Sequence, residues 1–94
     1  MLHAVVLINA KSDRIPETAE AIADIHGVSE VYSVTGNVDL VAIVRVLKEE
    51  DLPAVVPQGI AKVPGVEKTE TLLAFEVYSK HDLERLFSIG FEEG

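Results

Sequence analysis

The sequence predicts an α+β domain in which two helices pack on a four-stranded antiparallel sheet, connected in the order β-α-β-β-α-β. Short runs rich in β-branched residues alternate with segments whose apolar residues recur at helical spacing. Residues 22–28 (IADIHGV) also match residues 60–66 (IAKVPGV) at an offset of 38 residues. The offset indicates two copies of a strand–helix–strand unit, which together form the ferredoxin-like split βαβ arrangement.

The first unit begins with an apolar run at residues 2–8, which is expected to be a strand. Ser12 or Asp13 is expected to cap the following helix, and Pro16 lies near its start, where the missing N–H costs nothing. Gly27 is expected to end the helix. The apolar stripe of this helix consists of Ile15, Ala19, Ile22 and Ile25.

The middle of the chain predicts a hairpin. A second strand is expected over residues 28–35 and a third over residues 38–47. Between them lies Gly36-Asn37, a dipeptide typical of tight turns between antiparallel strands.

The second unit continues with a helix that Asp51 is expected to cap and that runs to Val63. Pro57 and Gly59 lie inside this helix, and an interior proline costs a helix about 3 kcal/mol. We therefore expect a kink or a later start. A fourth strand is expected over residues 66–78.

The chain is expected to hold one folded domain over residues 1–80. The remaining residues, 81–94, are expected to form a short helix or an added edge segment, ending in a solvated acidic tail. Ninety-four residues make one domain, and a chain this short gains stability when it associates.

The first and third predicted strands, around Val5 and Ile43, are apolar at both alternating positions. Two helices cover only one face of a four-stranded sheet, so the second face also needs a cover. The simplest cover is a second copy, packed sheet to sheet as a dimeric α/β barrel. The alternatives are the chain's own tail or a fusion partner.

Composition excludes several classes of function. The chain has no cysteine, which rules out disulfides, thiol nucleophiles and thiolate metal sites, and which fits a reducing cytoplasm. Its formal net charge is −8 and its basic residues are scattered, so no direct DNA binding is expected. No membrane span, signal peptide, phosphate loop or dinucleotide fingerprint is recognisable, and the three histidines lack metal-ligand spacing. We expect no cofactor, no metal and no catalytic residue.

Two segments are candidates for binding a small molecule. Gly36 and Asn37 could present backbone N–H groups to a carboxylate, and Asp39 could accept hydrogen bonds from an ammonium group. Thr69 and Thr71 stand two residues apart on a strand, so their hydroxyls share one face. The alternative is purely structural: a hairpin turn whose aspartate satisfies loop amides, and threonines that simply favour strands.

These two segments, VYSVTGNVDL (31–40) and PGVEKTET (64–71), resemble the effector-binding half of the leucine-responsive/asparagine-responsive (Lrp/AsnC) regulator family, the RAM domain. The resemblance covers about residues 1–80. It implies sheet-packed dimers that assemble further, often into octameric rings, and an amino-acid effector bound between dimers. It assigns the effector site to Gly36, Asn37, Asp39, Thr69 and Thr71.

One departure from the family pattern affects the expected function. Typical members carry a helix-turn-helix before this domain, whereas here the resemblance starts at Met1. We therefore expect a sensor that regulates transcription indirectly, by assembling with full-length DNA-binding regulators. Two alternatives stay open: an assembly module with a vestigial site, and a small dimeric α/β-barrel enzyme such as a cofactor-free monooxygenase.

Overall fold

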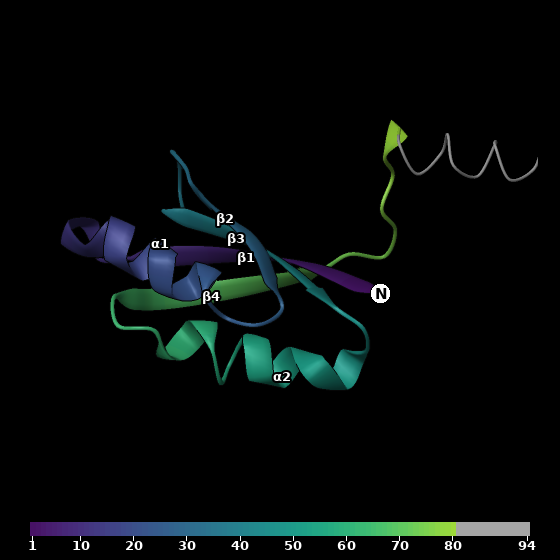
Figure 1. The fold of residues 1–94 in the computed structure, drawn as a ribbon. Coiled ribbons are helices and arrows are strands. Elements are labelled where there is room, and N and C mark those ends of the chain that lie inside the picture. The colour runs from purple at the N-terminus through teal and green to yellow at the C-terminus, as the bar shows by residue number, and fades with distance from the viewer. Residues whose placement is uncertain (81–94) are drawn as a thin grey trace, which may run out of the picture.

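The computed structural model describes residues 1–80 and shows a single antiparallel sheet flanked by helices (Figure 1). Its strands are β1 (Leu2–Ala10), β2 (Val28–Ser33), β3 (Leu40–Val46) and β4 (Val66–Leu73). They lie in the order β2-β3-β1-β4, so the two units interleave. The predicted ferredoxin-like topology is confirmed. The segment 81–94, for which a helix or edge segment was expected, lies outside the described residues.

Two helical segments pack on one face of this sheet. The first is α1 (Ile15–Ala23), which follows a 3₁₀ turn at Ser12–Arg14. The second is α2 (Leu52–Val55), with 3₁₀ turns before it at Glu49–Asp51 and after its connecting loop at Ile60–Lys62. Ile15, Ala19 and Ile22 of the predicted stripe face the core from α1, and Ile22 is fully buried. Gly27 was expected to end this helix, but α1 ends at Ala23, so Ile25 packs against the core from the turn that follows the helix.

The core lies between the helices and alternate residues of the two central strands. These residues, with the helical side chains that meet them, are Ala4, Val6, Ile8, Ala10, Ile22, Leu40, Ala42, Val44, Val46, Val55, Val56 and Ile60. The opposite parity forms what we call the open face: Val5, Leu7, Tyr32, Val41, Ile43 and Leu72, as the strand register shows. Both central strands are thus apolar on both faces, and α1 and α2 cover only one.

The second helix departs from prediction. A continuous helix to Val63 was expected, but α2 has only four residues. Pro57 lacks the N–H that helix propagation needs, and the chain instead closes wider turns, with Ala61 N–H donating to the Val56 carbonyl at 2.9 Å. Gly59 allows the tight return, because a Cβ there would collide with the carbonyl oxygens of Ala54 and Val55.

The expected helix caps are wrong. Neither Ser12 nor Asp13 caps α1, because both belong to the preceding 3₁₀ turn and α1 has no side-chain cap. Asp51 occupies the N-cap position of α2, yet its carboxylate makes no capping hydrogen bond, because its backbone is already helical.

The strand ends also differ from the expected ones. β2 ends at Ser33, and β3 begins at Leu40, so their connection has six residues rather than two. β4 ends at Leu73 instead of residue 78: its last residue pairs with Ala4, and one more backbone hydrogen bond follows, from Ala74 N–H to the His3 carbonyl at 2.9 Å.

The sequence repeat has a structural counterpart in two glycine turns. Gly27 precedes β2 with φ +102°, and Gly65 precedes β4 with φ +100°, a conformation that favours glycine. Each turn packs against the helical segment of the other unit. A Cβ at Gly27 would lie 2.7 Å from Val55 Cγ2, and one at Gly65 would collide with Thr18 Oγ1.

Candidate functional site

The loop that connects β2 to β3 is held against the end of β1 by backbone and side-chain hydrogen bonds. Asp39 N–H donates to the Ile8 carbonyl at 2.9 Å, and Val34 N–H donates to the Asp39 carbonyl at 3.0 Å. The side-chain amide of Asn9 donates to the Asn37 carbonyl at 3.0 Å. Backbone and side-chain hydrogen bonds from β1 thus hold this loop in place.

The Asp39 side chain has a structural role as a hydrogen-bond acceptor. Its Oδ2 accepts a hydrogen bond of 2.8 Å from Ala10 N–H. Ala10 lies at an irregularity in the pairing of β1 with β4, and the aspartate supplies the acceptor there. A carboxylate offers two oxygens and about four acceptor positions. Within residues 1–80, Oδ1 accepts no hydrogen bond.

Gly36 is the exposed tip of this loop. Its φ is +117°, and a Cβ built there would meet nothing within 4 Å. The backbone conformation, and not crowding by neighbours, thus favours glycine at this position. Gly36 and the exposed Asn37 leave the main chain of the loop open to approach by a small molecule.

The two candidate threonines lie on β4 at the other side of β1. Thr69 pairs with Ile8 and Thr71 pairs with Val6, so both side chains stand on the helix-covered side of the sheet. Thr69 is half-buried and Thr71 is exposed. The expectation that the two hydroxyls share one face agrees with this register.

Within one chain, the loop and the threonines do not converge. Ile8 of β1 pairs on one side with Leu40, the residue after Asp39, and on its other side with Thr69 of β4. Two strand spacings, about 10 Å, therefore separate β3 from β4, with β1 between them. Thr71 lies a further pair of residues along the strand. The structure places Gly36, Asn37, Asp39 and Thr69 at one end of the sheet, but one chain does not enclose a ligand between them.

Polar groups flank the apolar part of the open face. Arg45 Nε donates to His3 Nδ1 at 3.3 Å across the paired strands β3 and β1. Tyr32 lies on β2, and a hydrogen bond to the Glu30 carboxylate raises the pKa of its hydroxyl above the ordinary value of 10.0, with the charge of Arg45 opposing. Apolar side chains thus dominate the middle of this face, and charged ones its margin.

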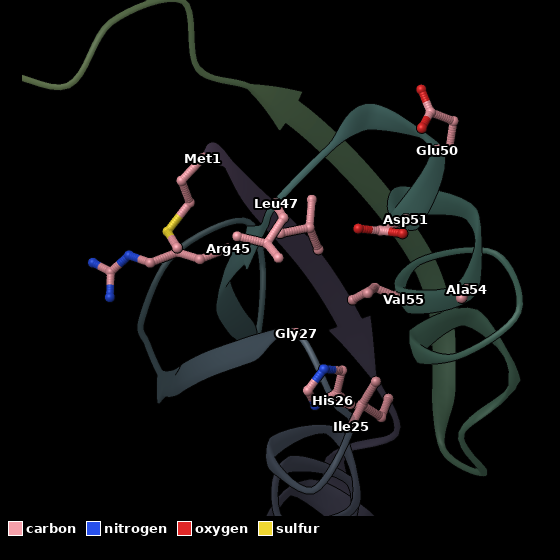
Figure 2. A pocket seen from close by; sticks show the side chains of 11 residues that line it. Met1, Ile25, His26, Gly27, Arg45, Leu47, Glu50, Asp51, Ala54 and Val55 are labelled. Carbon is pink, nitrogen blue, oxygen red and sulfur yellow. The ribbon is translucent and has the colours of Figure 1, made fainter.

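A cavity of about 530 Å³ lies at the other end of the sheet, where sequence reasoning expected no site (Figure 2). Four segments line it: Met1 before β1, the turn between α1 and β2, the end of β3, and the 3₁₀ turn at Glu49–Asp51 together with α2. His26, one of the three histidines that lack metal-ligand spacing, is exposed at this cavity. These segments are far apart in sequence and share no motif, so no sequence signal joined them.

The part of the chain that the structure describes contains no cluster of three or more histidine, aspartate or glutamate side chains that could hold a metal ion. Nor is any helix within residues 1–80 long and apolar enough to cross a membrane.

Comparison with known proteins identifies the family. Residues 3–83 match the family model of the Lrp/AsnC ligand binding domain. A protein of Thermus thermophilus with a solved crystal structure is 52% identical, with a TM-score of 0.80 over 85% of this chain and 100% of that one. The feast or famine regulatory protein of M. tuberculosis, solved in complex with L-methionine, is 26% identical, with a TM-score of 0.67 over 85% of this chain and 54% of that one.

Curated relatives agree with this assignment. An HTH-type transcriptional regulator of Pyrococcus horikoshii is 36% identical over 76 residues, which are 81% of this chain and 51% of the regulator. The FL11 regulator of Pyrococcus abyssi is 30% identical over 77 residues, or 82% of this chain and 50% of that protein. The chain thus spans about half the length of the curated relatives it matches, and it belongs to the Lrp/AsnC ligand binding domain family.

Proposed function

We propose that this chain is a sensing and oligomerisation domain that binds an amino acid between dimers, without doing chemistry on it, and that it regulates transcription through assembly with DNA-binding partners. The observation that carries the proposal is the loop of Gly36, Asn37 and Asp39. Hydrogen bonds join it to β1, yet it presents open main chain and a carboxylate oxygen that accepts no hydrogen bond within residues 1–80.

The chemistry of this loop suits a zwitterion. Exposed backbone N–H groups around Gly36 and Asn37 can donate to a carboxylate, and Asp39 Oδ1 can accept a charge-assisted hydrogen bond from an ammonium group. Hydrogen bonds to β1 hold the loop in place, which would reduce the conformational entropy lost when a ligand binds. The M. tuberculosis relative in complex with L-methionine supports an amino acid as the ligand class.

The ligand would lie between subunits because one chain supplies only part of the enclosure. An α-amino acid is too small to contact both Asp39 and Thr71 across the width of β1. Thr69 and Thr71 of another subunit would either contact the same ligand or form part of the wall against which that ligand packs. Residues of a neighbouring subunit would complete the side-chain pocket.

The open face supports dimerisation. Its central residues Val5, Leu7, Val41 and Ile43 are apolar, and the structure gives them no cover within residues 1–80. A second sheet packed on this face would bury them about 10 Å from their counterparts, as in other two-layer sheet packings. We infer a two-fold dimer, and from the family an assembly of dimers such as an octamer.

The link to transcription rests on the relatives. They are HTH-type regulators, and this chain matches about half of their length. Its formal net charge of −8 disfavours direct contact with DNA, so mixed assembly with a full-length regulator in the cytoplasm would carry the signal. His3 is engaged by Arg45 and His26 is exposed, which fits binding better than acid–base catalysis.

The test is a thermal-shift panel of the twenty amino acids, run beside a mass measurement in solution. A ligand at a hundred times its dissociation constant adds about 2.7 kcal/mol to the stability of the native state. A clear rise with one or a few amino acids, lost in Asp39→Asn, would support the proposal and name the ligand class. No rise with any amino acid, in a protein that still assembles, would favour a pure assembly module, which the open face alone would support.

A further inference from the structure

The cavity at the N-terminal end of β1 is a second, chemically distinct place where this domain can hold a small molecule. We propose that it binds a primary ammonium compound with a short aliphatic body, whose charge meets Asp51. The cavity is separate from the loop site, because it lies where β1 begins and β3 ends, whereas the loop contacts the end of β1 and the start of β3. The inference therefore goes beyond the proposed effector site.

The floor of the cavity is apolar and closely packed. Val46 and Val55 are 7% and 3% exposed, and half-buried Ile25 adjoins them. Gly27 lets the turn before β2 approach α2, because any side chain there would strike Val55. The cavity volume of about 530 Å³ falls within the usual range for sites that hold small molecules. An aliphatic chain of four or five carbons would be desolvated on this floor.

Asp51 supplies an unpaired negative charge at the wall. It stands at the N-cap position of α2 but makes no capping hydrogen bond, and within residues 1–80 its carboxylate forms no ion pair. Figure 2 shows this carboxylate above the side chain of Val55. The Asp51 carboxylate is half-buried next to apolar side chains. A cation with an aliphatic body can donate a charge-assisted hydrogen bond to this carboxylate and also pack against those side chains.

The other charged lining residues are already engaged or lie at the rim. Glu50 forms a weak ion pair with Lys48 at 4.0 Å, and Figure 2 shows its carboxylate at the outer edge. Arg45 extends away from the cavity and donates to His3. His26 remains at the lower rim, where its imidazole could donate to the carboxylate of an amino acid. An amine and its parent amino acid share the ammonium group that Asp51 would recognise.

The experiment titrates isopentylamine and leucine, which differ only in the carboxylate, into protein with labelled isoleucine and valine methyl groups. The methyl signals of Ile25, Val46 and Val55 report on the cavity, and those of Val34 and Val38 report on the loop. Methyl spectra remain readable in a large oligomer. Asp51→Asn removes the charge with little change of shape, and Glu49→Gln removes a neighbouring charge outside the cavity.

We expect isopentylamine to shift the cavity methyls, with affinity falling about tenfold in Asp51→Asn and staying within about twofold of wild type in Glu49→Gln. Leucine shifting the same methyls would support the proposal, with an amino acid as the source of the ammonium group. Ala54→Leu, which fills the cavity from α2, should abolish the shifts without removing any charge. The proposal is overturned if the amine leaves the cavity methyls unchanged, or if Asp51→Asn binds as wild type does. Shifts confined to the loop methyls would overturn it too, while leaving the proposed function intact.

Discussion

Asp39 is expected to serve both stability and binding, and two substitutions separate these roles. In Asp39→Ala, the Ala10 N–H loses its acceptor at 2.8 Å, and Ala10 is only 5% exposed, so water replaces that acceptor poorly. An unsatisfied buried donor costs about 1–3 kcal/mol. Asp39→Asn keeps a carbonyl acceptor and loses only the charge, so we expect it to cost less than about 1 kcal/mol. Both variants should lose amino-acid binding.

The measurement is thermal unfolding at one fixed protein concentration, because assembly makes the melting temperature depend on concentration. For a domain of this size, 1 kcal/mol corresponds to roughly 4–8 °C. Asp13→Ala is the control, since Asp13 is exposed and caps no helix, and we expect a change within about 0.5 kcal/mol. Wild-type stability in Asp39→Ala would refute the bond to Ala10. Wild-type affinity in Asp39→Asn would refute the carboxylate as the ammonium acceptor.

Four further substitutions test the fold and its open face. Ile43→Asp places a charge in the middle of the open face, so the mass of the protein measured by sedimentation should fall toward that of the 10.2 kDa monomer. An unchanged mass would contradict dimerisation through this face. Gly65→Ala should lower the stability of the folded protein more than Gly36→Ala does. Both variants carry the roughly 1–2 kcal/mol backbone penalty of positive φ, but only a side chain at position 65 also meets a buried side chain. Equal melting temperatures of the two variants would contradict this packing. Tyr32 should ionise above its ordinary pKa of 10.0 in the folded protein, and Glu30→Gln should lower the pH of that transition in the phenolate absorbance. Because the pKa of Tyr32 is raised in the folded state, the stability gained from its hydrogen bond to Glu30 is complete below pH 10.0 and is lost as the pH rises through the folded-state pKa. A phenolate transition at the same pH in Glu30→Gln would count against this contact.

The topology could be predicted from sequence because its signals are local and repeated. Alternating apolar runs and the 38-residue offset placed four strands and two helical segments in the correct order. The helix ends were less predictable. Asp51 and Asp13 are residue types that favour N-caps, but whether a side chain caps depends on backbone angles that the following turn decides.

The candidate site could be predicted only in part. The positive φ of Gly36 follows from local turn chemistry, and the structure shows it. Asp39 was expected to satisfy loop amides, but its carboxylate accepts a hydrogen bond from Ala10 on β1 instead. The separation of this loop from Thr69 could not be predicted, because it depends on the register in which β3 and β4 pair with β1, which the strand order alone does not give. The cavity beside Asp51 was missed for the same reason: Gly27, Val46 and Val55 meet there only after the two units interleave.

That interleaving has a consequence for how the chain reaches its native state. The three strand ladders join β1 to β3, β1 to β4 and β2 to β3, so every ladder connects a strand of the first unit with a strand of the second. Neither unit can form a sheet by itself, although each carries its own helix and glycine turn. The first half of the chain therefore cannot form its part of the sheet until the second half is present. Two separated halves would behave as complementary fragments that fold only when they associate.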